Sequence, residues 1–185
     1  MLKKDIIIVD IDFTLVDSTI PYQYLNGVKE TNNYDTYFRN LDRVRVIEGV
    51  PELIKTYILS GCDVCFLTSR NVDKFSCYHT LEIIEQLFKK EVLTNGCSYN
   101  VFFRAIGDTR SSVEMKTTKI KEYLKDYNIR AVFDDEDAII EAYKNIFDLK
   151  NTNIYHINIS NEGLTELPLN EFIEDYTYPH IRKLI

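Results

Sequence analysis

Short apolar runs alternate with longer segments of helical spacing along this chain, and this alternation restricts the fold more than any other feature. We expect strands over 5–9, 64–67, 101–103, 129–133 and 154–157, and helices over 50–60, 73–90, 113–127 and 135–147. Strands that alternate with helices of about ten residues or more imply right-handed crossovers and a parallel sheet. The sequence therefore predicts an α/β fold, a three-layer sandwich with a mainly parallel central sheet covered on both faces.

Polar residues directly follow three of the expected strands. Asp10 and Asp12 follow the run Ile6-Ile7-Ile8-Val9, Thr68-Ser69-Arg70 follow the strand at 64–67, and Asp134-Asp135 follow Phe133. Ligands of parallel sheets bind at the carboxyl ends of the strands. Two carboxylates one residue apart at a buried strand end repel each other and lose hydration, so they need a cation or a shared proton. The pattern indicates a chemical site along this edge of the sheet.

The string Asp10-Ile11-Asp12-Phe13-Thr14-Leu15 resembles the nucleophile motif of the haloacid dehalogenase (HAD) superfamily. Most members of that superfamily are phosphatases with an aspartate nucleophile and magnesium. The resemblance implies a Rossmann-like sheet, with Asp10 as the nucleophile that attacks phosphorus and Asp12 as general acid and then general base. An isolated pair of acids with this spacing can also simply cap the structure that follows. The residues at the other strand ends therefore have to distinguish a catalytic pair from a capping pair.

The second and third motifs of the superfamily have counterparts later in the chain. Cys65-Phe66-Leu67-Thr68 resembles the second motif and implies that the Thr68 hydroxyl holds a phosphoryl oxygen. Strand-end hydroxyls also form turns, which is the structural alternative. The third motif is a single lysine, and we select Lys116 over Lys119 and Lys121 to neutralise the crowded carboxylates and the phosphoryl group. The alternative is that Lys116 is one of several solvated helix lysines.

Phe133-Asp134-Asp135 resembles the fourth motif, whose acids complete a magnesium site. The resemblance implies that Asp135 is the direct ligand and Asp134 its support. Asp10 would add a side-chain oxygen, and Asp12 its backbone carbonyl. This all-oxygen set suits Mg²⁺, which is the cofactor we expect. Acids at the start of a helix are also favoured by the helix dipole without any metal.

A second assignment of the last two motifs is open at this stage. Ile106-Gly107-Asp108 also follows an apolar stretch and would make Lys89 or Lys90 the third motif. That assignment places Arg104 inside a strand and leaves Asp134-Asp135 without a role.

The stretch before Lys116 is similar to the 3′-phosphatase domain of phage-type polynucleotide kinases. Arg104 and Asp108-Thr109-Arg110 match an R…D-x-R pattern that contributes to the substrate side of the pocket there. Arg70 is a further candidate for substrate binding, because its guanidinium can grip phosphate in a fork geometry. The implied substrate is a nucleic-acid 3′-phosphate end or a nucleotide. No G-x-x-x-x-G-K-[ST] pattern occurs, so the kinase half of such enzymes is not expected.

Three other functions compete with this interpretation. A small-molecule 5′-nucleotidase would suit the acidic composition. A receiver-like phospho-acceptor domain also places acids, a Thr and a Lys on a parallel sheet, but its phosphorylated Asp would end a later strand, where Leu67 is followed by Thr68. A noncatalytic binding protein would not need the complete set of side chains.

The chain of 185 residues fits one domain, with residues 16–48 as a small helical cap insertion. The insertion is rich in aromatic residues that could stack on a base or simply pack the cap against the sheet: Tyr22, Tyr24, Tyr34, Tyr37 and Phe38.

The net charge of −7 and the pI near 5.0 argue against an extended, nonspecific nucleic-acid surface. The apolar run before Asp10 is too short for a secretory signal, and no run approaches a membrane span, so we expect a cytoplasmic protein without membrane contact. Cys62 and Cys65 flank a buried strand and are expected to act as small apolar residues. Residues 161–185 carry no chemical signature.

Overall fold

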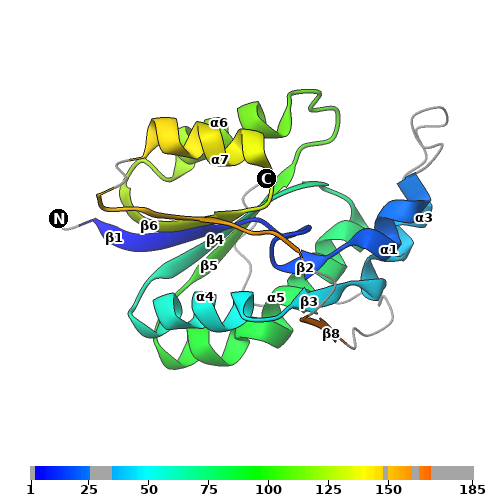
Figure 1. The fold of residues 1–185 in the computed structure, drawn as a ribbon, viewed down its shortest axis with the longest axis horizontal. Helices are drawn as coiled ribbons and strands as arrows, with labels where there is room; N and C mark the ends of the chain where they lie inside the picture. Colours follow the sequence, from blue (N-terminus) through cyan, green and yellow to red (C-terminus); the bar gives the residue numbers. More distant parts are fainter. Residues whose placement is uncertain (1–2, 26–34, 148–149, 160–162, 168–185) are drawn as a thin grey trace.

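The computed structural model describes residues 3–25, 35–147, 150–159 and 163–167. Its centre is a five-stranded sheet in the order β5-β4-β1-β6-β7 (Figure 1). The strands are β1 (Lys4–Val9), β4 (Asp63–Asn71), β5 (Tyr99–Arg104), β6 (Tyr127–Asp134) and β7 (Asn153–His156). Every pairing within this sheet is parallel. The predicted α/β class is confirmed.

Two pairs of helices cover the two faces of the sheet (Figure 1). They are α4 (Val50–Leu59) with α5 (Lys74–Thr94), and α6 (Ser112–Tyr123) with α7 (Asp137–Ile146). Because side chains of a strand alternate between faces, β1 supplies Ile7 and Val9 to the core under α4 and α5. Ile6 and Ile8 enter the core under α6 and α7. The sandwich therefore has two apolar cores, one on each face.

A second, small sheet lies beside the main one, with the antiparallel order β2-β3-β8. Its strands are β2 (Val16–Asp17), β3 (Arg45–Ile47) and β8 (Leu164–Glu166). Short helical segments lie between β2 and β3, and we call them the cap: α1 (Thr19–Tyr22), η1 (Gln23–Leu25), α3 (Asp35–Arg39) and η2 (Leu41–Arg43). The sequence did not predict this sheet, because β2 and β3 are too short for a detectable pattern.

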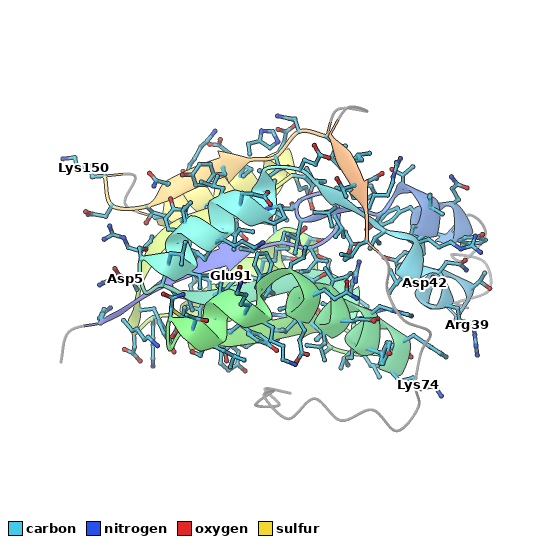
Figure 2. All side chains as sticks on the ribbon, turned by 90° about the horizontal axis from the view of Figure 1, so that it is seen from below. Asp5, Arg39, Asp42, Lys74, Glu91 and Lys150 are labelled. Atoms are coloured by element: carbon cyan, nitrogen blue, oxygen red, sulfur yellow. The ribbon has the colours of Figure 1, made fainter. Side chains whose placement is uncertain are left out.

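The cap covers the end of the molecule opposite the start of β1. Asp5 and Lys150 lie toward one end, and Arg39, Asp42 and Lys74 lie toward the other (Figure 2). At the base of the cap, the Asp17 carboxylate accepts a hydrogen bond from the Thr19 N–H at 3.0 Å and pairs with Arg45 across β2 and β3. The cap is thus fixed over the edge where the strand of Asp10 ends.

Two expected boundaries were wrong. The helix predicted to run to Tyr127 ends at Tyr123, because the chain turns at Leu124 and Tyr127 already pairs with Lys4 of β1. The strand predicted to end at Leu67 continues to Asn71, which pairs with Arg104. The residues Thr68, Ser69 and Arg70 therefore lie within β4 rather than in a loop after it.

The remaining sequence expectations concern cysteines, membranes and the cap. All four cysteines are free thiols, and Cys62 and Cys65 are buried, in line with an apolar role. No helix among the described residues has the length and apolar character needed to span a membrane. Tyr34 and the side chain of Phe38 lie outside the described part, as does most of the segment 161–185.

Candidate active site

The carboxyl ends of three adjacent strands bring the predicted residues together. In the sheet, β1 lies between β4 and β6, so the segments after β1 and β6 are neighbours. The Asp10 N–H donates to the Phe133 carbonyl at 3.0 Å and joins these two segments. Asp10 and Asp134 are both buried at this edge. The sheet order therefore explains why acids far apart in the sequence meet.

Lys116 links two of these acids. Its Nζ donates to Asp10 Oδ1 at 2.7 Å and to Asp134 Oδ2 at 2.8 Å, and its side chain is only 3% exposed. Burial opposes the charged form, but the two carboxylates outweigh it and raise the pKa of Lys116 above its ordinary value. Lys116 is therefore a permanent cation held between two acids.

The start of helix α6 fixes the position of Lys116. The Ser111 hydroxyl accepts the Glu114 N–H at 3.2 Å, and the Glu114 carboxylate accepts the Ser111 N–H at 3.1 Å. This reciprocal capping fixes where the helix begins. Met115 and Ile120 are buried in the core below and set the rotation of the helix. Lys116 then reaches the strand ends from the α6 side of the sheet.

Asp10, Asp134 and Asp135 form a cluster able to hold a metal ion. One carboxylate oxygen of each lies within 4.8 Å of the other two. Burial, with the charge of Asp134 added, raises the pKa of Asp10 to about 8 against the opposing effect of Lys116. Burial and Asp134 also raise the pKa of Asp135, whose Oδ1 accepts a hydrogen bond from Thr14 at 3.2 Å. Three crowded oxygen donors, among them two acids with raised pKa values, fit a small divalent cation such as Mg²⁺.

Asp12 lies outside this cluster and is held by Arg70. The Arg70 Nε donates to Asp12 Oδ2 at 2.9 Å and Nη2 donates to Asp12 Oδ1 at 2.7 Å. The Ser18 hydroxyl donates to the same Oδ1. Burial raises the pKa of Asp12, but Arg70 and Ser18 outweigh burial and lower it below the ordinary value. The side chain of Asp12 thus faces Arg70. The contact that the sequence predicts between the Asp12 backbone carbonyl and a metal ion stays a prediction.

These groups line a pocket of about 420 Å³. Its charged lining residues are Asp10, Asp12, Asp108, Asp135, Glu136, Arg70, Arg104 and Lys116. Its other lining residues are Phe13, Tyr22, Leu25, Tyr37, Ser69, Asn71 and Ser112. The pocket therefore joins the strand ends, the cap and the loop between β5 and α6.

One side of the pocket is aromatic. The ring of Tyr22 lies edge-on to Phe13, with ring centroids 4.8 Å apart, and edge-on to Tyr37 at 5.8 Å. Phe13 has a positive φ of 60°, a strained conformation for a bulky residue that is typical of functional turns. Tyr22 is 44% exposed, so its ring is accessible to a bound molecule. We call Phe13, Tyr22 and Tyr37 the aromatic wall.

The two predicted substrate arginines, Arg104 at the end of β5 and Arg110 after it, are mainly engaged with the loop between β5 and α6. Arg104 lines the pocket, but its Nη1 donates to the Arg110 carbonyl at 2.6 Å and its Nη2 to the Ser112 hydroxyl at 3.2 Å. Arg110 does not line the pocket and pairs with Asp108 at 2.7 Å. Their role as phosphate ligands stays a prediction, and in this structure they order the loop.

Thr68 does not line the pocket, although the sequence predicts that its hydroxyl holds a phosphoryl oxygen. Its side chain is fully buried, its Oγ1 accepts the Arg70 N–H at 3.2 Å, and it is not among the lining residues of the pocket. The neighbouring Ser69 does line the pocket and donates to Ser112 at 3.0 Å. The contact of Thr68 with a phosphoryl oxygen stays a prediction, and Ser69 is a second candidate.

The competing assignment of the third and fourth motifs has no support in the structure. Asp108 follows β5, which is an edge strand separated from β1 by β4. Lys89 lies on the exposed side of α5 and pairs with Glu85 at 3.0 Å. Asp134 and Asp135 instead lie beside Asp10.

Sequence reasoning missed several residues that support the site. The Tyr143 hydroxyl lies 3.5 Å from Asp134 Oδ2, and the Thr80 hydroxyl accepts Arg70 Nη1 at 2.8 Å. Ser18 directly precedes α1, a position where a serine is a common helix cap, and this was the one available signal. The partners of Tyr143 and Thr80 depend on helix packing, which local sequence does not encode.

Comparisons with known proteins agree with the observed fold. Among the solved structures that share the fold is "Structure of Pnkp1/Rnl/Hen1 complex", with 17% identity, a TM-score of 0.54 and coverage of 86% of this chain and 47% of the other. Another is the class C acid phosphatase from Bacillus anthracis with tungstate bound, with 16% identity, a TM-score of 0.51 and coverage of 85% of this chain and 68% of the other. This chain thus spans about half the length of the Pnkp1 complex chain that it matches. No curated protein matches the sequence significantly.

The family model of HAD superfamily subfamily IIIB, the acid phosphatases, matches residues 2–157. This match covers all five strands of the central sheet and every acid of the site described above. The chain therefore belongs to subfamily IIIB of the HAD superfamily, a family of acid phosphatases that hydrolyse phosphomonoesters.

Proposed function

We propose that this protein is a magnesium-dependent phosphomonoester hydrolase that works through an aspartyl-phosphate on Asp10. The observation that carries the proposal is the Lys116 ammonium held between Asp10 and Asp134, with Asp135 beside them. A carboxylate that accepts a phosphoryl group needs positive charge beside it. Lys116 provides such charge, and the acidic cluster can hold a metal ion that adds more. The family is one of acid phosphatases, which argues against the non-enzyme alternative, a receiver-like domain.

In the first step an Asp10 carboxylate oxygen attacks phosphorus and the ester P–O bond breaks. Asp12, which takes up a proton in the second step of each turnover, gives that proton to the leaving oxygen, which departs as an alcohol. In the second step water attacks the aspartyl-phosphate, Asp12 takes the proton from that water, and Asp10 is regenerated with release of phosphate. Lys116 stabilises negative charge on the phosphoryl oxygens in both steps.

Asp10, Asp134 and Asp135, with the Asp12 carbonyl, would hold Mg²⁺. When bound, the ion supplies positive charge to the phosphoryl oxygens and to the nucleophile. The residues present fit this ion, because all the donors are oxygens and their crowding is relieved by a cation.

The substrate that we propose is a nucleotide or a nucleic-acid 3′-phosphate end. The aromatic wall supports this, because stacking of a base on an aromatic ring contributes on the order of 1 to 3 kcal/mol. The fold likeness to a chain of a Pnkp1/Rnl/Hen1 RNA repair complex is compatible with a polynucleotide end. At the identity observed, that likeness reports fold alone.

A mononucleotide phosphatase is the second candidate, and one observation favours it. Asp108 and Glu136 line the pocket, whereas Arg104 and Arg110 already donate hydrogen bonds to groups of the loop between β5 and α6. A polynucleotide would bring further phosphates toward these acids, and a mononucleotide would not. The chain also carries a net charge of −7.

A substrate panel with a salt series tests both candidates. Purified protein is assayed with a 3′-phosphorylated oligonucleotide, a 3′-mononucleotide and a 5′-mononucleotide, each with Mg²⁺ and with EDTA. A polynucleotide substrate predicts a kcat/KM that falls steeply with ionic strength, and a mononucleotide a weak dependence. Activity without divalent metal, or full activity of Asp10→Asn, would refute the proposed chemistry.

A further inference from the structure

We propose that Arg70 is a positioning residue that fixes the direction of the Asp12 carboxyl toward the reacting phosphate, rather than a ligand of the substrate. The inference rests on the proposed function, in which Asp12 moves the proton. It assigns to Arg70, and to its anchor Thr80, a role in the reaction that the family match does not give.

The contact between Arg70 and Asp12 is bidentate and buried. Nε and Nη2 each donate to a different oxygen of Asp12, at 2.9 Å and 2.7 Å, and the Arg70 side chain has no exposed surface. Two parallel bonds fix the plane of a carboxylate as well as its distance. A lysine offers one point of charge and cannot fix that plane.

Arg70 is itself anchored from a different element. Its Nη1 donates to the Thr80 hydroxyl on α5 at 2.8 Å, and Thr80 is fully buried. Its backbone N–H donates to Thr68 Oγ1 at 3.2 Å, within β4. The guanidinium is therefore held by α5, and the backbone that carries it by β4, both independently of Asp12, so Arg70 can act as a rigid support for the carboxyl.

Ser18 completes the support on the other side. Its hydroxyl donates to Asp12 Oδ1, and it lies at the start of α1, fully buried. The Asp12 carboxyl is thus held between the core, through Arg70, and the base of the cap, through Ser18. This leaves little freedom for the side chain to rotate away from the pocket that it lines.

The same geometry argues against Arg70 as a direct phosphate ligand. Three of its five N–H groups already donate, two of them as a fork to Asp12 and one to Thr80, and the side chain has no exposed surface. A phosphoryl oxygen gripped by the fork would have to replace the Asp12 carboxylate. Lys116, by contrast, lies at the nucleophile Asp10, and its third N–H can reach a phosphoryl oxygen without displacing either carboxylate.

The test compares two substrates that differ in their need for a proton. An alkyl phosphate releases an alkoxide that must be protonated, whereas a nitrophenyl phosphate releases a stable phenolate. The variants are Arg70→Ala, Arg70→Lys, Thr80→Val and Asp12→Asn, with Arg130→Gln as the matched control. Arg130 pairs with Asp5 at 3.8 Å and is not a lining residue of the pocket. Asp5 lies at the opposite end of the molecule from Arg39 and Asp42 of the cap (Figure 2).

If Arg70 positions Asp12, the loss of kcat in Arg70 variants depends on the leaving group of the substrate. Arg70→Ala lowers kcat on the alkyl phosphate by roughly 100-fold or more, as expected for a lost proton transfer, and lowers kcat on the aryl phosphate much less. KM and inhibition by inorganic phosphate stay near the wild-type values. Arg70→Ala combined with Asp12→Asn is no worse than Asp12→Asn alone, because the two residues act as a unit.

The remaining variants keep the inference testable if Arg70→Ala folds poorly. Thr80→Val removes only the anchoring hydroxyl and gives the same selective loss at smaller size, whereas Thr80→Ser restores the activity. Arg70→Lys keeps the charge and shows the loss, because it does not fix the carboxyl plane. Melting temperatures of all variants show whether each is folded.

Three results would overturn the inference. An equal loss on both substrates would assign Arg70 a purely structural role, and weaker inhibition by phosphate with a raised KM would make it a substrate ligand. If the losses of the two single variants add in the double variant Arg70→Ala with Asp12→Asn, Arg70 does not act through Asp12. If instead wild-type protein is inactive, or Asp10→Asn is active, the proposed function itself fails and the inference falls with it.

Discussion

Lys116 Nζ lies 2.7 Å from Asp10 Oδ1 and 2.8 Å from Asp134 Oδ2, so one buried ammonium ties the expected nucleophile to the expected metal site. These three residues come from α6, the end of β1 and the end of β6. Removing the ammonium leaves two buried carboxylates facing each other. The arrangement therefore predicts an effect on both catalysis and stability.

Lys116→Met is predicted to lower kcat by about 100-fold or more, the usual size for loss of a buried charge aimed at the transition state. It also destabilises the protein in EDTA by about 3 kcal/mol or more, because the partners remain buried and unpaired. Steady-state kinetics and urea unfolding measure the two effects. Lys121→Met, on the exposed side of the same helix, is the control. Equal behaviour of the two variants would contradict the prediction.

Magnesium is predicted to stabilise the folded protein through the acidic cluster. A ligand present at a hundredfold excess over its Kd adds about 2.7 kcal/mol to the free energy of unfolding. Thermal unfolding with Mg²⁺ and with EDTA measures this, with Asp135→Asn as the variant and Asp137→Asn, an exposed neighbour, as the control. A melting temperature of the wild type that does not respond to Mg²⁺ would argue against the site.

Tyr22 is predicted to recognise the group attached to the phosphate. Tyr22→Ala raises KM for a nucleotide by about 5- to 160-fold, the equivalent of 1 to 3 kcal/mol of stacking. It leaves KM for a small alkyl phosphate unchanged, because that substrate has no base. Tyr22→Phe keeps the ring and the wild-type KM. A similar rise for both substrates would show that the aromatic wall only supports the cap.

Stability is predicted to fall in mild acid because of His79. Burial, together with the Arg70 charge and against that of Asp42, lowers the pKa of His79 from 6.5 to about 4. Between these pH values the unfolded chain binds a proton at His79 and the folded protein does not, so the free energy of unfolding decreases as pH falls from 6.5 to 4. Urea unfolding measures the slope, which is smaller in His79→Gln. An unchanged slope would exclude this residue as the cause.

Much of the fold was predictable because the relevant signals are local. Apolar runs such as Ile6-Ile7-Ile8-Val9 identify strands buried on both faces, and the parallel-sheet rule then places Asp10 and Asp134 at one edge. The pairing of β8 with β3 was not predictable, because it joins short segments that are distant in sequence.

The sequence predicted which acids come together at the strand ends, but it did not predict their hydrogen-bond partners. The sequence offered Arg70 and Arg104 as phosphate ligands, since an exposed guanidinium suits that task. In the structure Arg70 binds Asp12 and Thr80, and Arg104 binds its own loop. Which donors an arginine has left depends on packing between β4, α5 and the loop before α6, and no local pattern contains that information.

The measurement that tests the account most directly is capture of the phosphorylated protein. A substrate carrying labelled phosphate is mixed with the wild type and with Asp10→Asn, and the reaction is stopped in acid within one turnover. The account predicts label on the wild type that hydroxylamine releases, as expected for an acyl phosphate, and none on Asp10→Asn. Label of equal amount on Asp10→Asn, or turnover by that variant at the wild-type rate, would contradict it.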